Sequence, residues 1–136
     1  MISQAETIDH ILIETKTIAV VGLSSSRFRA GYYVPEYLQQ KGYRIIPVNP
    51  ELERERLGEI VYPDLESVPE LVDLVLVFRR PEHIPAIVDS AIKIGAMGVW
   101  MQLGIAHAAA AEKARRAGLH VVMNTCMMVE HKHWKK

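Results

Sequence analysis

The sequence predicts an α/β fold that is doubly wound, with a mainly parallel sheet of about five strands and helices on both faces. Apolar, β-branched runs of strand length alternate with segments of helical periodicity along the chain. Continuous apolar runs of this kind are typical of strands that helices cover on both sides. The 136 residues correspond to one domain, and no internal repeat or low-complexity segment interrupts them.

The first half of the chain supplies two helices and two strands. A helix is expected at 3–15, where apolar residues share one face, and a strand follows at 17–22. Helical spacing returns at 33–41 and stops before a glycine, as helices commonly do. The next strand is expected at 44–48, and its Pro47 requires an edge-facing position or an unpaired amide.

The middle of the chain contains the strongest strand pattern. The charged stretch 51–59 is interpreted as a solvated loop, and 61–65 as a short extended piece. The apolar run 72–78 is the strongest predicted strand. A helix is expected to follow from about 81 to 95, because a proline is tolerated in its first turn and its apolar residues recur on one face.

The last third repeats the alternation once more. A strand is expected at 98–103, an alanine-rich helix at 106–117 and the last strand at 120–123. Residues 127–136 are interpreted as a C-terminal tail. Right-handed crossovers then join the strands into one open parallel sheet.

The charge balance argues against bulk attraction to an anionic partner. Lys plus Arg and Asp plus Glu each number 16, so neither nucleic acid nor a membrane surface is expected as a partner. The single cysteine, Cys126, cannot form an internal disulfide, which favours a reducing compartment. The N-terminus lacks the basic region of a signal peptide, and no apolar run reaches the length of a membrane span. We therefore expect a cytoplasmic protein.

Ligands of open parallel sheets bind beyond the carboxyl ends of the strands. The segments that follow the five predicted strands are 22–26, 48–50, 78–81, 102–104 and 124–126. The first of them is a glycine, a leucine and three serines before a predicted helix, so backbone amides, hydroxyls and a helix N-terminus can face an anion. It is interpreted as a phosphate-binding loop; the alternative is a tight turn whose serines are solvated.

The dinucleotide fingerprint G-x-G-x-x-G is absent, because the next glycine after Gly22 is Gly31. The second predicted strand ends at Asn49 and not at the acidic residue that binds a ribose diol. Both features disfavour a nicotinamide cofactor. They favour a nucleotide that carries an additional phosphate, because an acidic residue would repel it.

Three arginines supply local positive charge in a chain whose net charge is zero. They are Arg29, Arg79 and Arg80. Successive side chains of a strand point to opposite faces, so one of Arg79 and Arg80 at most is expected in the crevice if the strand reaches them. The alternative is a pair of arginines that extend along the surface into solvent.

Segments along nearly the whole chain carry a resemblance to a known family. They are Gly22, Leu23, Ser24 and Ser25 with Arg29 and Tyr32, then 43–50, 57–58 with 61–63, 77–81, 99–105, and 121–123 with Cys126, Glu130 and His131. In combination these residues resemble the stand-alone coenzyme A-binding proteins, which are similar to the N-terminal nucleotide-binding domain of the succinyl-CoA synthetase α-subunit. Four residues depart from the pattern of that family: Arg27, Ala30, Gly31 and Thr125.

The resemblance implies a Rossmann-like fold that binds coenzyme A (CoA) or an acyl-CoA across the strand ends, without catalysis by this chain alone. It places the loop 22–25 on the phosphates, the turn 48–50 by the adenosine, and Phe78 and Arg79 along the cofactor. CoA also fits the residues independently, because its pyrophosphate and 3′-phosphate suit arginines and a helix N-terminus. The expected cofactor-binding residues are Gly22, Leu23, Ser24, Ser25, Arg29, Tyr32, Val48, Asn49, Pro50, Phe78, Arg79, Pro81, Gln102, Gly104 and Cys126.

No catalytic or metal-binding residues are expected. Cys126 follows the last strand and could form a mixed disulfide with CoA; the alternative is an inert, half-buried thiol. Glu130, His131 and His133 match no known metal-ligand spacing and fit a lysine-rich, flexible tail better. The glycine-serine loop lacks the second glycine of a nucleophile elbow.

Two other function classes stay open. One is a nicotinamide-dependent oxidoreductase or a fragment of a CoA ligase, against which the missing fingerprint and the missing ribose carboxylate count. The other is a scaffold or dimerisation module that uses the sheet and the N-terminal helix. The acyl group and a homo-oligomeric state are left open as well.

Overall fold

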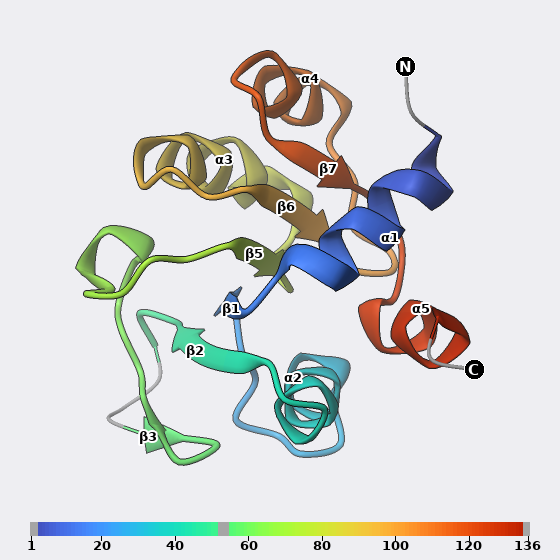
Figure 1. Cartoon of the computed structure of the whole chain (residues 1–136). Helices are drawn as coiled ribbons and strands as arrows, with labels where there is room; N and C mark the ends of the chain where they lie inside the picture. The colour runs from blue at the N-terminus through green and yellow to red at the C-terminus, as the bar shows by residue number, and fades with distance from the viewer. Residues whose placement is uncertain (1–2, 52–54, 135–136) are drawn as a thin grey trace.

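The computed structural model describes residues 3–51 and 55–134. Its centre is a parallel sheet with the strand order β2-β1-β5-β6-β7 (Figure 1). The strands are β1 Thr17–Val21, β2 Arg44–Val48, β5 Leu74–Val77, β6 Gly98–Met101 and β7 His120–Val122. This arrangement confirms the predicted doubly wound α/β fold, and β2, which contains Pro47, lies at the edge of the five-stranded sheet.

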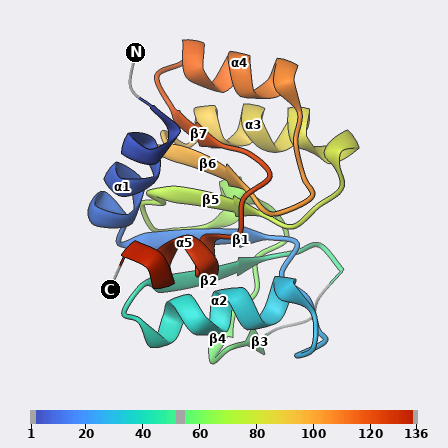
Figure 2. The same ribbon diagram turned by 90° about the vertical axis from the view of Figure 1, so that its right-hand side faces the viewer.

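Helices cover both faces of the sheet (Figure 2). They are α1 Gln4–Glu14, α2 Ala30–Gln40, α3 Ile84–Lys93, α4 Ala108–Arg116 and α5 Met127–Trp134. Ala19 and Val21 of β1 belong to one buried cluster with α3 and α4, while Ile18 and Val20 belong to another with α1, α2 and α5. Alternate residues of one strand thus enter two cores, which is why the strands have no polar face.

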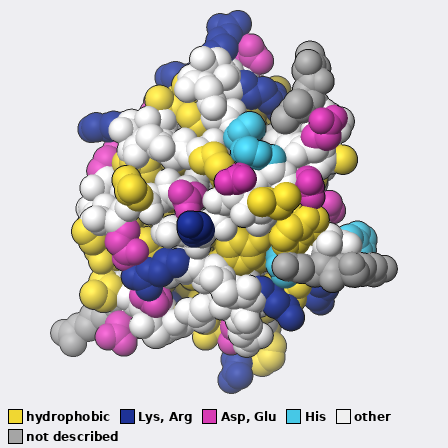
Figure 3. Space-filling model, viewed as in Figure 1, with side chains coloured by type: hydrophobic (Ala, Val, Ile, Leu, Met, Phe, Trp, Pro, Cys, Tyr) yellow, Lys and Arg dark blue, Asp and Glu magenta, His cyan; other side chains and the backbone are white. Residues whose placement is uncertain are grey.

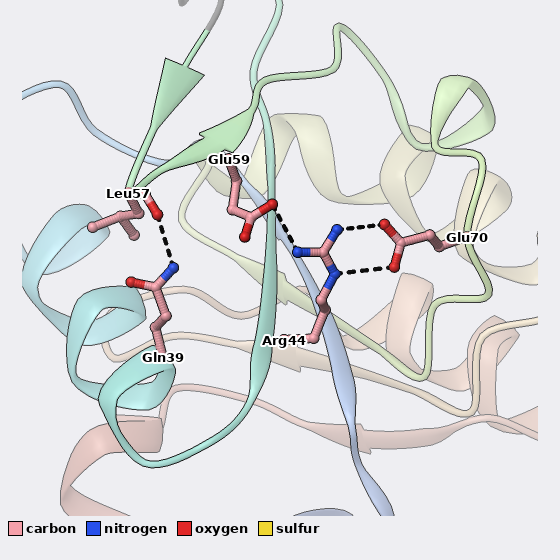
Figure 4. A network of polar contacts seen from close by, with 5 residues as sticks. All are labelled: Gln39, Arg44, Leu57, Glu59 and Glu70. Carbon is pink, nitrogen blue, oxygen red and sulfur yellow. Dashed lines mark hydrogen bonds and ion pairs between the residues drawn. The ribbon is translucent and has the colours of Figure 1, made fainter.

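The charged stretch after β2, which we expected to be a solvated loop, contains a small hairpin. Its strands are β3 Glu55–Arg56 and β4 Glu59–Ile60; residues 52–54 lie outside the described residues. Arg44 of β2 fixes the hairpin with an ion pair of 2.7 Å to Glu59, and it also donates through Nε to Glu70 (3.0 Å; Figure 4). Ion pairs between side chains hold this segment in place. Because charged residues make these contacts, the sequence contains no apolar periodicity that would predict the hairpin.

Two further segments differ in detail from the expected elements. The extended piece at 61–65 makes a single parallel bridge between Tyr62 and Val48, and its end enters a 3-10 helix, Leu65–Ser67. The helix expected from residue 81 begins as a separate 3-10 turn, Pro81–His83, and becomes α-helical only at Ile84.

The prediction of a C-terminal tail is wrong for residues 127–134, because these residues form the helix α5. Met127 and His131 are buried in this helix. The hydroxyl of Tyr37 in α2 forms a hydrogen bond with Nδ1 of His131 (2.7 Å), and the ring of Tyr43 lies edge-on to the same imidazole. His131 therefore belongs to an aromatic contact between helices, which its spacing from other histidines does not reveal.

The surface agrees with the neutral composition. On the face shown in Figure 3, basic and acidic side chains are interspersed over several elements. In the part of the chain that the structure describes, no helix is both long enough and apolar enough to cross a membrane.

Candidate functional site

The strand order places a cavity where the connections of the sheet change direction. From β1 the chain crosses to β2 on one side, and the next strand of the sheet, β5, lies on the other side of β1. Val21 of β1 stands opposite both Val48 and Val77, so the three strands end close together. A cavity of about 500 Å³, called here the switch-point cavity, lies beyond these ends. This is the position at which open parallel sheets bind ligands.

Three chain segments line the switch-point cavity, and each follows one of these strands. The lining residues are Gly22, Leu23, Ser24, Ser25, Arg29, Asn49, Glu51, Phe78, Arg79, Arg80 and His83.

Backbone hydrogen bonds shape the loop between β1 and α2. The amide of Gly22 donates to Val48 O (2.9 Å), and that of Ser24 donates to Gly31 O (3.0 Å). Ser26 N donates to Oγ of Ser24 (3.0 Å), so this serine hydroxyl takes part in the turn. These bonds fold the loop back on the first turn of α2, and the exposed Ser25 stays in the lining of the cavity.

The N-terminus of α2 adjoins this loop and has no side-chain cap among the described residues. Its N-cap is Arg29, which makes no capping hydrogen bond. In contrast, Ser3 caps α1 and His107 caps α4 through side-chain acceptors. Backbone amides at an uncapped N-terminus, together with the helix dipole, favour a negatively charged group.

Arg79 lies directly across Gly22. A Cβ atom added at Gly22 would lie 3.1 Å from both Cγ and Cδ of Arg79, and Gly22 has a φ of +90°. The backbone conformation therefore favours glycine at this position, and a Cβ there would also have to displace the Arg79 stem. An Nη atom of Arg79 lies 3.2 Å from Nε2 of His83.

Both Arg79 and Arg80 line the cavity, although strand alternation allowed only one of them. The expectation depended on a strand that reaches both residues. In the structure β5 ends at Val77, so the alternation no longer applies to the arginines. With Arg29 they bring three guanidinium groups to one cavity in a chain of zero net charge.

Asn49 connects the end of β2 with the loop after β1. Its Nδ2 donates to Leu23 O (3.0 Å), and its Oδ1 accepts from the amide of Glu51 (2.9 Å). The side-chain amide thus holds two of the three lining segments together. It also turns the chain so that the carboxylate residue Glu51 lines the cavity.

Eight of the fifteen expected site residues line the cavity: Gly22, Leu23, Ser24, Ser25, Arg29, Asn49, Phe78 and Arg79. The other seven do not: Tyr32, Val48, Pro50, Pro81, Gln102, Gly104 and Cys126.

Several of these seven residues have evident structural contacts. Val48 is buried in the core. Gln102 is 3% exposed, and its Oε1 accepts from Met127 N (3.3 Å). The amide of Gly104 donates to Oδ1 of Asn124 (2.7 Å), and Cys126 is half-buried against the core of α1, α2 and α5. Gln102 and Gly104 follow β6, and Cys126 follows β7, beside the cavity on the same edge of the sheet.

The sequence reasoning did not place three lining residues in the site. The sequence predicts Arg80 as local charge that competes with Arg79 for the crevice and Glu51 as part of a solvated loop, and it does not indicate His83 as a ligand-binding residue. No spacing rule indicates His83, because Arg79 precedes the 3-10 turn Pro81–His83 and the two residues share no helix.

A second cavity of about 540 Å³ lies at the amino end of β7, between α1 and α4. Its lining includes Thr7, Leu119 and Val121, and its exposed charges, Glu112 and Arg115, are of opposite sign and on one helix. It lacks the arginines and the loop that distinguish the switch-point cavity.

Comparisons with known proteins show which family the chain belongs to. The family model described as "CoA binding domain" matches residues 16–132. A curated relative, the uncharacterized protein YneT of Bacillus subtilis (strain 168), is 37% identical over 129 residues, which cover 95% of this chain and 94% of that protein.

Solved structures of similar chains have the same fold. A hypothetical protein from Pyrococcus horikoshii OT3 is 38% identical, with a TM-score of 0.93, and the match covers 98% of this chain and 94% of that one. A protein from Thermus thermophilus is 36% identical, with a TM-score of 0.90 and coverage of 96% and 98%.

Proposed function

We propose that this chain, which belongs to the CoA-binding domain family, binds coenzyme A or an acyl-CoA in the switch-point cavity. The observation that carries the proposal is the convergence of a glycine-serine loop, an uncapped helix N-terminus and three arginines on that one cavity. Residues 1–136 would act as a single binding domain for this ligand. We further propose a cytoplasmic protein that binds the cofactor without itself catalysing a reaction.

The phosphate groups of CoA match the positively polarised part of the cavity. The loop Gly22–Ser25 and the first turn of α2 offer amides and hydroxyls to the pyrophosphate. Arg29, Arg79 and Arg80 can form paired hydrogen bonds with phosphate oxygens, which a lysine cannot do in the same planar geometry. Charge-assisted bonds in a partly enclosed cavity would give affinity without a strongly basic surface.

The remaining expected residues define a path along the carboxyl edge of the sheet. Asn49 and Pro50 follow β2 and would adjoin the adenosine. Phe78 offers an apolar contact beside Arg79. Gln102, Gly104 and Cys126 follow β6 and β7, so they would adjoin the pantetheine arm with its terminal thiol. Tyr32, Val48 and Pro81 support these segments from neighbouring positions in the chain.

A panel of ligands tests the proposal. Thermal unfolding is measured with CoA, acetyl-CoA, dephospho-CoA, NAD and NADP, because a ligand that binds the folded state raises its unfolding temperature. We expect CoA to raise it and NAD to leave it unchanged. A smaller rise with dephospho-CoA, and no such difference in Arg79→Ala, would assign Arg79 to the 3′-phosphate. Stabilisation by NAD with none by CoA would overturn the proposal.

Glu51 supports a second candidate, a nicotinamide nucleotide. Glu51 follows β2 in the chain and lines the cavity. Dinucleotide-binding proteins bind a ribose through an acidic side chain near this position. The substitution Glu51→Gln separates the two candidates. If CoA is the ligand, removing this negative charge should leave CoA binding unchanged or strengthen it; if NAD is the ligand, the substitution should weaken NAD binding.

A further inference from the structure

The side chain of Arg79 is restrained at both of its ends. Its stem passes over Gly22, where Cγ and Cδ occupy the space that a side chain on residue 22 would need. Its guanidinium group lies 3.2 Å from Nε2 of His83. A long, flexible side chain is thereby held in one direction at the edge of the switch-point cavity.

The contact with Arg79 requires one particular role of the His83 ring nitrogen. A guanidinium group can only donate, so Nε2 of His83 must accept. The form of the imidazole that can accept this hydrogen bond is the one with its proton on Nδ1. His83 belongs to the 3-10 turn that follows β5, where His83 N donates to Arg80 O (3.0 Å). This turn places His83 within reach of the Arg79 side chain.

We infer that His83 is a positioning residue, which holds the Arg79 guanidinium ready for a phosphate group of the ligand. The inference rests on the proposed function for the identity of that ligand. Ordering a free arginine side chain has a cost in conformational entropy, and a guanidinium that is ordered before binding avoids part of this cost. His83 would thus raise affinity through Arg79 and not through a contact of its own.

A double-mutant cycle tests this coupling, with the dissociation constant for CoA measured by calorimetry. We expect His83→Ala to weaken binding roughly five- to tenfold in the wild-type background, and less than about twofold in Arg79→Ala. His83→Gln should restore most of the affinity, because its Oε1 can accept from Arg79. His133→Ala, which changes an exposed histidine in α5, serves as the matched control and should bind as the wild type does.

An equal loss from His83→Ala in both backgrounds would show a direct contact with the ligand and would overturn the inference. No loss in the wild-type background would overturn it as well.

A second measurement needs no ligand. Long-range ¹H–¹⁵N spectra of the free protein report which ring nitrogen of His83 carries the proton. We expect the Nδ1–H form, and its loss in Arg79→Ala; an Nε2–H form in the wild type would refute the hydrogen bond. Failure of the wild type to bind CoA would overturn the proposed function, whereas these spectra would still decide whether His83 holds Arg79.

Discussion

The substitution Gly22→Ala adds a single carbon atom, the Cβ, at the centre of the candidate site. The added Cβ would lie 3.1 Å from Cγ and Cδ of Arg79 and 3.3 Å from the carbonyl carbon of Phe78. The arginine stem is flexible and can move away, whereas the backbone of Phe78 follows the paired strand β5 and cannot move freely. We therefore expect the substitution to displace Arg79 and to strain the loop.

The strain can be separated from the contact by a matched control, Gly118→Ala. Gly118 has a φ of +91°, nearly the same as the +90° of Gly22, but a Cβ added there meets nothing within 4 Å. A non-glycine residue in this conformation costs about 1–2 kcal/mol in both variants. With an unfolding entropy of about 2.1 cal/mol/K per residue, each 1 kcal/mol lowers the Tm of a chain of this length by roughly 3–4 °C.

The two variants should differ in ligand binding. Both are expected to unfold at a Tm several degrees below that of the wild type, with Gly22→Ala the lower. Only Gly22→Ala should lose affinity for CoA, by about tenfold or more, because a hydrogen bond to a charged group contributes about 1.5–3 kcal/mol. Calorimetric titration measures this. Equal affinities for CoA in the two variants would refute the reasoning that Gly22 exists to admit Arg79.

Three further predictions concern stability. Burial and the neighbouring His10 ring, whose centroid is 4.6 Å away, lower the pKa of His120. The unfolded chain therefore binds the proton more readily, and the Tm should fall as the pH drops below about 6.5. This fall should be smaller in His120→Asn than in the control His133→Asn. The Arg44 guanidinium lowers the pKa of the Glu70 carboxyl, so a small stabilisation should be present at neutral pH and lost below about pH 4. Arg44→Ala should remove this pH dependence of the stability. High salt should weaken the stabilisation. Tyr37→Phe removes the hydroxyl that bonds His131 (2.7 Å) and should cost about 1 kcal/mol in chemical denaturation, with faster amide hydrogen exchange in α5; unchanged exchange there would contradict the packing of this helix through His131.

The strands were predictable because their side chains pack into a hydrophobic core on each face of the sheet. Alternate residues of β1 enter opposite clusters, so the sequence shows an uninterrupted apolar run, whose short length and β-branched residues favour a strand over a helix. The hairpin β3–β4 and the helix α5 were not predictable in this way. The ion pair between Arg44 and Glu59 holds the hairpin, and the contacts of His131 with Tyr37 and Tyr43 hold α5; both depend on residues distant in the chain.

The site was predictable to the extent that it follows from strand ends. In a parallel sheet every carboxyl end lies on one edge, so the loops after β1, β2 and β5 were expected to meet. The sequence does not show which of the five strand ends lie next to one another, because that depends on the strand order. With the order β2-β1-β5-β6-β7, the loops after β6 and β7 fall beside the cavity and not in its lining.

The early end of β5 accounts for the lining residues that the sequence reasoning missed after this strand. A strand that continued through Arg80 would have sent Arg79 and Arg80 to opposite faces. Because β5 stops at Val77 and a 3-10 turn begins at Pro81, the chain bends back over the strand ends. That bend brings both arginines to the cavity and returns His83 to within 3.2 Å of Arg79. The position at which one strand ends therefore determines both the number of cations in the site and the residue that orients one of them.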